Sequence, residues 1–175
     1  MACAFMGEVS SDGAWYGVRV KPRSEFKASE ELSVQGFEAF LPVRRVRRRW
    51  SDRVKVLAAP LFPGYLFCQF HTVNRSRVLR TPGVAYILGY GRTPTPVSER
   101  EVRSIRRLVE SGMVLVDYPY LQAGQRVRIE RGPLTGVEGI IVKAENGKAR
   151  VVVSVTLLQR AVATELDRDW IGSDE

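Results

Sequence analysis

The densest group of chemically active side chains in the sequence is the stretch from Arg44 to Lys55. It holds seven basic residues and one acid, a net charge of +6. Guanidinium groups bind phosphates and release counterions, and a tryptophan in the same stretch can stack on an unpaired base. The stretch predicts an exposed hairpin that contacts nucleic acid; the alternative is a solvated charged loop without a ligand. The candidate contacts are Arg44, Arg45, Arg47, Arg48, Arg49, Trp50 and Arg53.

Catalytic and metal-binding groups are scarce by comparison. The chain has two cysteines, Cys3 and Cys68, and one histidine, His71, too few for a four-ligand zinc site or a disulfide framework. The histidine has no serine or cysteine partner at a spacing typical of a nucleophilic site. No glycine-rich loop ends in Gly-Lys-Ser/Thr. We therefore expect no enzyme activity, no metal and no cofactor.

The charge of the whole chain indicates a polyanionic partner. Lys plus Arg number 27 and Asp plus Glu number 19 among 175 residues, which gives a net charge of +8. Residues 1–121 hold 19 basic and 11 acidic side chains, whereas residues 122–175 hold 8 of each. This division predicts two functional halves. No stretch is long and apolar enough for a membrane span and no secretory signal is found, so we expect a cytoplasmic monomer.

The first half has the pattern of an antiparallel sheet flanked by helices. After an expected flexible leader over 1–13, alternating segments predict strands over 15–20, 37–43, 65–70 and 84–88. Ser24 is a candidate N-cap of a helix that runs to about Gln35. Ser98 and Glu101 form a capping box for a second helix that Gly112 closes. We expect these side chains to turn inward: Phe26, Leu32 and Val34 on the first helix, and Val102, Ile105, Leu108 and Val109 on the second.

The second half has the pattern of a small all-β domain. From Gln122 the chain consists of short strands, and Asn146-Gly147 between two β-type runs is a strong signal for a two-residue hairpin. No helix fits, so a small barrel is the simplest fold. The fold class is therefore α+β. Its expected parts are a sheet domain over 14–112, a linker over 113–121 and a β-barrel over 122–173.

Four motifs follow one another in an order typical of one family. Trp15-Tyr16, then Leu61-Phe62-Pro63-Gly64-Tyr65-Leu66-Phe67, then Thr81-Pro82-Gly83-Val84 resemble the N-terminal (NGN) domain of the NusG family of transcription elongation factors. Gly124-Gln125-Arg126-Val127-Arg128-Ile129 with the Gly132-Pro133-Leu134-Thr135-Gly136 turn resembles that family's KOW module. The resemblance covers about residues 14–171. It implies an NGN sheet with helices and an SH3-like barrel, in agreement with the patterns above.

The resemblance also implies RNA polymerase as the main partner. In the family an apolar pocket of the first domain grips the clamp helices of the polymerase β′ subunit. The matching positions here are Tyr65, Phe67, Tyr90 and Val102. Aromatic side chains suit such a contact because they supply much area with few rotors to order. Alternation alone favours the alternative that Tyr65 and Phe67 are core residues.

Nucleic-acid contacts follow from the resemblance as well. The basic stretch lies where family members extend toward upstream DNA, and Lys21 and Arg23 lie where relatives touch the non-template strand. Nascent RNA is a further candidate partner. The implied function is to suppress pausing or termination by binding the active polymerase state more tightly than the paused one. The alternative is a stand-alone KOW-containing RNA-binding or ribosome-associated protein.

The barrel departs from the housekeeping pattern of the family. Leu134 and the run Leu158-Gln159-Arg160 stand where those members have aromatic residues that help bind Rho or a ribosomal protein. Leu134, Leu158 and Arg160 are thus the candidate partner surface of the KOW module, with the partner left open. Residues 160–167, ending near Trp170, resemble the UpxY-type and RfaH-like antiterminator paralogues. That resemblance implies an operon-specific antitermination factor.

Overall fold

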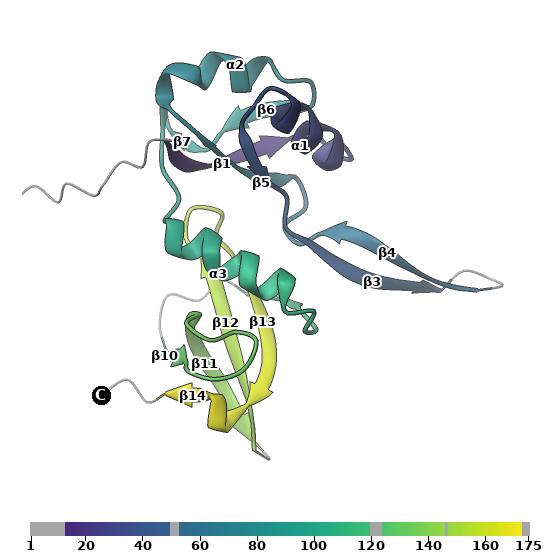
Figure 1. The fold of residues 1–175 in the computed structure, drawn as a ribbon, viewed down its shortest axis with the longest axis vertical. Coiled ribbons are helices and arrows are strands. Elements are labelled where there is room, and N and C mark those ends of the chain that lie inside the picture. The colour runs from purple at the N-terminus through teal and green to yellow at the C-terminus, as the bar shows by residue number, and fades with distance from the viewer. Residues whose placement is uncertain (1–12, 50–52, 120–123, 146, 173–175) are drawn as a thin grey trace, which may run out of the picture. The chain divides into compact units, whose positions relative to one another are not determined.

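A computed structural model describes residues 13–49, 53–119, 124–145 and 147–172 of the chain. They form two compact units. The first comprises the described parts of 1–41 and 63–99, and the second those of 42–62 and 100–175. The elements of both units are labelled in Figure 1.

The first unit is built on a four-stranded antiparallel sheet in the order β2-β5-β1-β6. Two helices and a small separate hairpin complete it. The strands are β1 (Ala14–Val20), β2 (Glu38–Phe40), β5 (Tyr65–Phe70) and β6 (Val84–Ile87). The other elements are α1 (Glu25–Val34), the 3₁₀ turn η1 (Thr72–Asn74), α2 (Arg75–Arg80), β7 (Gly89–Tyr90) and β8 (Thr93–Pro94).

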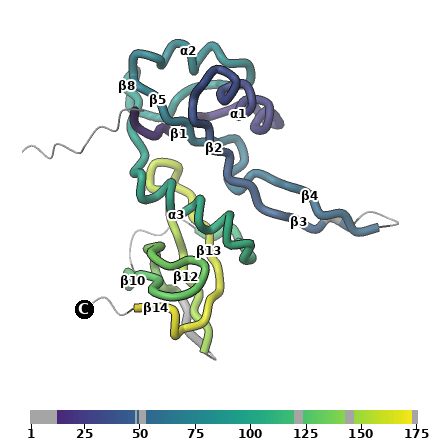
Figure 2. The backbone as a smooth tube through the Cα atoms, viewed as in Figure 1, coloured from purple at the N-terminus to yellow at the C-terminus, as the bar shows by residue number. Residues whose placement is uncertain are grey.

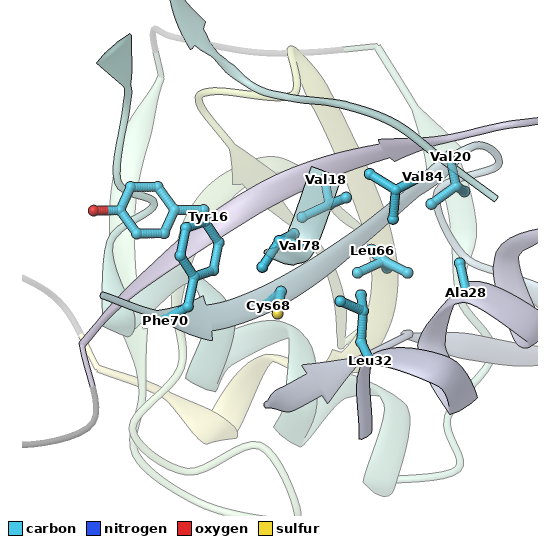
Figure 3. Close-up of a cluster of buried hydrophobic side chains, with 10 residues drawn as sticks. All are labelled: Tyr16, Val18, Val20, Ala28, Leu32, Leu66, Cys68, Phe70, Val78 and Val84. Atoms are coloured by element: carbon cyan, nitrogen blue, oxygen red, sulfur yellow. The ribbon is translucent and has the colours of Figure 1, made fainter. Parts of the chain in front are cut away.

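Both helices cover the same face of this sheet and close the hydrophobic core. Successive residues of a strand point to opposite faces, so alternate residues of β1 and β5 reach the helices. Tyr16 and Phe70 meet there with ring centroids 4.5 Å apart, and burial raises the pKa of the Cys68 thiol to about 12, which keeps it protonated and unreactive at neutral pH. The core residues in Figure 3 are Tyr16, Val18, Val20, Ala28, Leu32, Leu66, Cys68, Phe70, Val78 and Val84.

The inward face of α1 differs in part from the expected one. Leu32 is fully buried, as predicted, but Phe26 and Val34 are 51% and 79% exposed, so their inward placement was wrong. The buried residues are Glu25, Ala28 and Leu32, which have the spacing i, i+3 and i+7 of one helix face. Apolar character alone does not identify the inward residues of α1, because its buried face is short and includes the carboxylate of Glu25. That carboxylate accepts a hydrogen bond from the Gly64 N–H.

The second unit contains the basic hairpin, the capped helix and a six-stranded antiparallel sheet. The hairpin is β3 (Val43–Arg49) with β4 (Val54–Pro60), and the helix is α3 (Glu99–Glu110). The sheet order β14-β10-β11-β12-β13-β9 gives a KOW-like barrel, in agreement with the predicted fold class. Figure 2 traces its chain. Its elements are β9 (Val116–Tyr118), β10 (Gln125–Ile129), β11 (Glu138–Glu145), β12 (Lys148–Val155), β13 (Arg160–Asp167), the 3₁₀ turn η2 (Arg168–Trp170) and β14 (Ile171–Gly172).

Part of the predicted linker is an edge strand of this sheet. In β9, Val116 pairs with Ala163 and Tyr118 with Ala161 of β13. Tyr118 also packs against a small buried cluster that includes Val152, so the strand covers apolar surface of the barrel. Its three residues are too few to show a period, and Pro119 directly after them indicates a loop. The sequence therefore predicted only a connection here.

Helix α3 is bonded to two loops of the barrel. The N–H and hydroxyl of Thr156 donate to Glu101 Oε1 at 3.2 and 2.7 Å, and the Arg107 guanidinium donates to the Thr135 carbonyl. Glu101, which the sequence assigned to a capping box, thus serves a long-range contact. The predicted apolar stripe is confirmed for Val102, Ile105 and Leu108, which are at most 2% exposed.

Candidate functional site

Three side chains form a row across the sheet face opposite α1 and α2. Arg19 of β1 pairs directly with Tyr65 of β5 on one side and with Tyr86 of β6 on the other. Directly paired residues point to the same face, so the side chains of Tyr65, Arg19 and Tyr86 project together and the guanidinium lies over the Tyr65 ring. It sits 4.6 Å from the Tyr65 ring centroid, a cation–π distance. Tyr86 is 52% exposed and Tyr65 is partly exposed, so the row offers aromatic surface on a rigid support.

The turn before β5 explains how Tyr65 is held. Gly64 has φ +82°, a left-handed conformation that glycine adopts without strain. Its N–H donates to Glu25 Oε1 at 3.0 Å, which accounts for the buried carboxylate of α1. A Cβ at Gly64 would lie 2.5 Å from Arg19 Nη1. Glycine is therefore needed both for the turn and for the close approach of the arginine that packs on Tyr65.

Gly64→Ala is expected to lower the free energy of unfolding by about 1–2 kcal/mol, because an L-residue is strained at this φ. It should also push the Arg19 guanidinium off the Tyr65 ring. The Arg19 side-chain N–H resonance in an NMR spectrum reports that movement, because the ring current shifts it.

Gly36→Ala is the matched control for this change. Gly36 has φ +87°, and a methyl group added there would meet no atom within 4 Å, so alanine brings the same strain without a clash. Stability should fall by a similar amount and the Arg19 resonance should stay in place. An unmoved Arg19 resonance in Gly64→Ala would contradict the packing role assigned to the glycine.

The four predicted pocket residues differ in how much surface they offer. Tyr90 on β7 is 84% exposed and Tyr65 is partly exposed, so both can meet a partner. Phe67 is fully buried and stacks on Phe40 with ring centroids 6.0 Å apart, and Val102 of α3 is 2% exposed. Phe67 and Val102 are thus interior residues in this structure. We call the exposed or partly exposed tyrosines Tyr65, Tyr86 and Tyr90 of the first unit the aromatic surface.

The hairpin presents three of its predicted arginines on one face. In the β3–β4 register Arg45 pairs with Ala58, Arg47 with Val56 and Arg49 with Val54. All three arginines are exposed, and Val54 and Val56 beside them are 61% and 56% exposed. The described part of the hairpin, 43–49 and 53–60, contains no Asp or Glu to offset the charge. We call the face of Arg45, Arg47 and Arg49 the arginine face.

The other hairpin residues predicted to contact nucleic acid do not belong to the arginine face. Arg44 is an exception to the prediction, because its Nη2 forms a 2.7 Å ion pair with Asp117 and its Nη1 donates to the Leu115 carbonyl at 3.3 Å. The guanidinium thereby ties the hairpin to the segment before the barrel, and we remove it from the nucleic-acid set. Arg53 is exposed. Trp50 and the side chain of Arg48 lie outside the described part of the chain.

Lys21 and Arg23 lie in a tight turn between β1 and α1. Both are exposed, and the Ser24 N–H donates to the Lys21 carbonyl at 3.0 Å. Arg23 has φ +64°, a conformation that glycine or asparagine usually occupies in such a turn. An arginine held there at a cost in strain is a candidate for a binding role, since strained residues gather at functional sites.

Arg23→Gly should make the fold more stable than Arg23→Ala by about 1 kcal/mol, because only glycine relieves the left-handed strain. Both changes remove the same charge, so the pair separates strain from electrostatics. Urea denaturation at neutral pH measures the difference. Equal midpoints for the two variants would show that position 23 is not strained in solution.

The predicted KOW partner surface is smaller than expected. Leu134 is fully buried and Leu158 is 6% exposed, so both belong to the barrel interior; only Arg160 of the three is exposed. Aliphatic residues at these positions therefore fill the core of the barrel. The expected contact through Leu134 and Leu158 is corrected accordingly.

The histidine and the cysteine of the described residues lie in different surroundings. His71 is exposed at the end of β5, and Cys68 is buried in the core. No three His, Cys, Asp or Glu side chains among those residues lie together in a way that could hold a metal ion. Within the same residues no helix is long and apolar enough to cross a membrane.

Sequence reasoning missed Arg19 and Tyr86 as site residues. Both signals were present: Arg19 is the charged residue on a strand face that it shares with Trp15 and Gly17, and Tyr86 is an aromatic residue in the short predicted strand 84–88. Their importance depends on the neighbouring strands, because only the register brings Tyr65, Arg19 and Tyr86 into one row.

Comparison with known proteins gives a consistent result. The family model described as transcription termination factor nusG matches residues 13–106. The transcription termination/antitermination protein NusG of Thermus thermophilus is 30% identical over 87% of this chain and 94% of its own length. That of Chlamydia pneumoniae is 31% identical over 89% and 92%. The solved structure of Thermotoga maritima NusG has a similar fold, with a TM-score of 0.54 at 24% identity over 93% of this chain and 97% of that one.

Proposed function

The chain belongs to the NusG family of transcription termination/antitermination proteins, and we propose that it acts on transcription by binding the clamp helices of RNA polymerase through the aromatic surface. Members of the family are transcription factors, not enzymes. The observation that supports the proposal most strongly is the row Tyr65–Arg19–Tyr86 on a rigid sheet. Aromatic side chains that project from a pre-organised support bind a protein partner at a small entropic cost.

The arginine face supports a second contact, with upstream DNA. Successive residues on one face of a strand are about 6.8 Å apart, so Arg45, Arg47 and Arg49 form a line of cations about 13–14 Å long. Such a line can neutralise several phosphates of one backbone. The valines beside it are exposed rather than covered by apolar neighbours. Lys21 and Arg23 add a separate pair of cations for the non-template strand.

The mechanism that follows is a change in populations rather than a chemical step. A protein that holds the polymerase clamp and the upstream DNA at once favours the closed, active state, in which both contacts can form together. Opening of the clamp during a pause breaks at least one of them. A ligand shifts such an equilibrium only by its difference in affinity between the two states, so binding to active complexes must be tighter than binding to paused ones.

We further infer that the chain is an operon-specific paralogue. The support is the aliphatic filling at Leu134 and Leu158, where the housekeeping pattern has aromatic residues for a partner of the KOW module. A barrel that buries aliphatic residues at these positions presents no aromatic side chain there to a partner. Occupancy across the genome tests this: an operon-specific factor should be found at few transcription units, and presence at most active genes would contradict it.

The function is tested by transcription in vitro on a template with a strong pause. Purified protein added to halted elongation complexes should shorten the pause and raise read-through, and the effect should saturate with protein concentration. Complexes that pause for the same time with and without saturating protein would overturn the proposed function. Binding to free RNA with no binding to polymerase would favour the alternative of a KOW-containing RNA-binding protein.

A further inference from the structure

A second group of arginines surrounds an open cavity of about 440 Å³ in the second unit. Arg100, Arg103 and Arg107 of α3 line it together with Ser104, and Arg128 of β10 and Glu138 of β11 complete the wall. We call Arg100, Arg103, Arg107 and Arg128 the arginine pocket. All four are exposed, so the cavity is open to solvent. None of them belongs to the hairpin or to the aromatic surface.

The geometry of helix α3 places the three of its arginines that line the pocket in one row. Positions 100, 103, 104 and 107 have the spacing i, i+3, i+4 and i+7, which gives one face of an α-helix. The buried stripe of α3, which contains Val102 and Ile105, occupies another face. At a rise of 1.5 Å per residue, Arg100 and Arg107 are about 10 Å apart along the axis.

Among the residues that line the pocket, negative charge offsets only part of the positive charge. Glu138 is the single carboxylate among the lining residues, and it pairs directly with Arg128 in the β10–β11 register. Arg107 donates to the Thr135 carbonyl, a neutral acceptor that leaves the positive charge in place. Four guanidinium groups against one carboxylate give the lining a net charge of +3 on a small surface. An excess of positive charge on one surface attracts an anion.

The lining favours a phosphodiester backbone over an acidic peptide. Peptide and protein contacts are anchored by apolar or aromatic side chains, and every lining residue here is charged, a serine or a glycine. Guanidinium groups hold phosphate oxygens through paired N–H donors, and the Ser104 hydroxyl is a neutral donor of the kind found in phosphate contacts. A row about 10 Å long is also longer than one isolated phosphate requires.

We propose that the arginine pocket is a second nucleic-acid site, which holds the backbone of a single strand independently of the β3–β4 hairpin. The charge of residues 122–175, with 8 basic and 8 acidic side chains, does not reveal the contribution of Arg128 to this site. The site arises only where α3 meets β10. It extends the proposed function by giving the protein one strand contact on the hairpin and another beside the barrel.

The test compares two double variants of the full chain with the same loss of charge. Arg100→Gln/Arg128→Gln removes two pocket cations, and Arg131→Gln/Arg168→Gln removes two exposed cations of the barrel that do not line the cavity. Fluorescence anisotropy with labelled oligouridylate measures the affinity at several salt concentrations. Labelled oligothymidylate in a parallel series distinguishes RNA from DNA as the source of the backbone.

The pocket variant should bind more weakly than the control and lose about 1.4 from the slope of log K against log salt, or about 0.7 for each single-strand phosphate contact. Its loss should add to the loss caused by replacing Arg45, Arg47 and Arg49 of the hairpin, because sites that share no residues or partners are approximately additive. Equal losses with both probes, or a loss with either probe alone, support the site. Affinity and slope equal to those of the control overturn it, whatever the hairpin and polymerase experiments show.

Discussion

Tyr65→Ala combined with Tyr90→Ala is expected to abolish binding to core RNA polymerase and to leave the thermal midpoint almost unchanged. Tyr90 is 84% exposed and Tyr65 is partly exposed, so neither contributes much to the core. Aromatic anchors that an interface buries cost at least about 2 kcal/mol each when truncated, so the pair should weaken binding by roughly 1,000-fold. Biolayer interferometry with immobilised polymerase and a thermal melt measure the two effects.

Phe26→Ala is the control for this double change. Phe26 is 51% exposed on α1, and the row of Tyr65 and Tyr86 lies on the sheet face away from that helix. Its loss removes a comparable aromatic surface and should leave the polymerase affinity unchanged. A large fall in the midpoint of the Tyr65/Tyr90 variant would assign the two tyrosines to the core and remove the support for the aromatic surface.

The second large effect is expected from the arginine face. Arg45→Glu/Arg47→Glu/Arg49→Glu reverses three exposed cations that have Ala58, Val56 and Val54 as cross-strand neighbours. Binding to duplex DNA should become weak, and the slope of log K against log salt should lose about 2.7, or about 0.9 for each phosphate contact. Electrophoretic mobility shifts at several salt concentrations measure both quantities.

Lys27→Glu/Arg80→Glu/Arg92→Glu provides the same change in net charge at three exposed positions outside the hairpin. This control variant should bind duplex DNA somewhat more weakly, because it lowers the net positive charge of the whole protein. It should keep most of the slope of log K against log salt. The prediction fails when both triple variants show the same slope, because the hairpin would then act only through overall charge.

The sheet of the first unit was largely predictable because its strands alternate clearly. The alternation in Tyr65–Phe70 separates Leu66, Cys68 and Phe70 from Tyr65 and Phe67, and the core follows this division. Alternation cannot tell how much of each face a partner element covers. Tyr65 is therefore partly exposed while Phe67, two residues later, is fully buried.

Long-range pairs account for most of what the sequence could not reveal. The Arg44–Asp117 ion pair joins residues 73 apart, and the contact of Glu101 with Thr156 joins residues 55 apart. The residues beside Arg44 and Glu101 do not indicate these partners, so the sequence could not show that Arg44 forms an ion pair within the chain. The row of Arg19 with Tyr86 depends in the same way on strand order and register.

Site-specific photo-crosslinking identifies what the aromatic surface contacts in an assembled elongation complex. A benzoylphenylalanine in place of Tyr90 reports what lies against this surface, and the same residue in place of Phe26 reports on α1. We expect a crosslink from position 90 to the clamp helices of the polymerase β′ subunit and none from position 26. Clamp binding through the aromatic surface would be contradicted by equal crosslinks from both positions, or by no crosslink to polymerase from position 90.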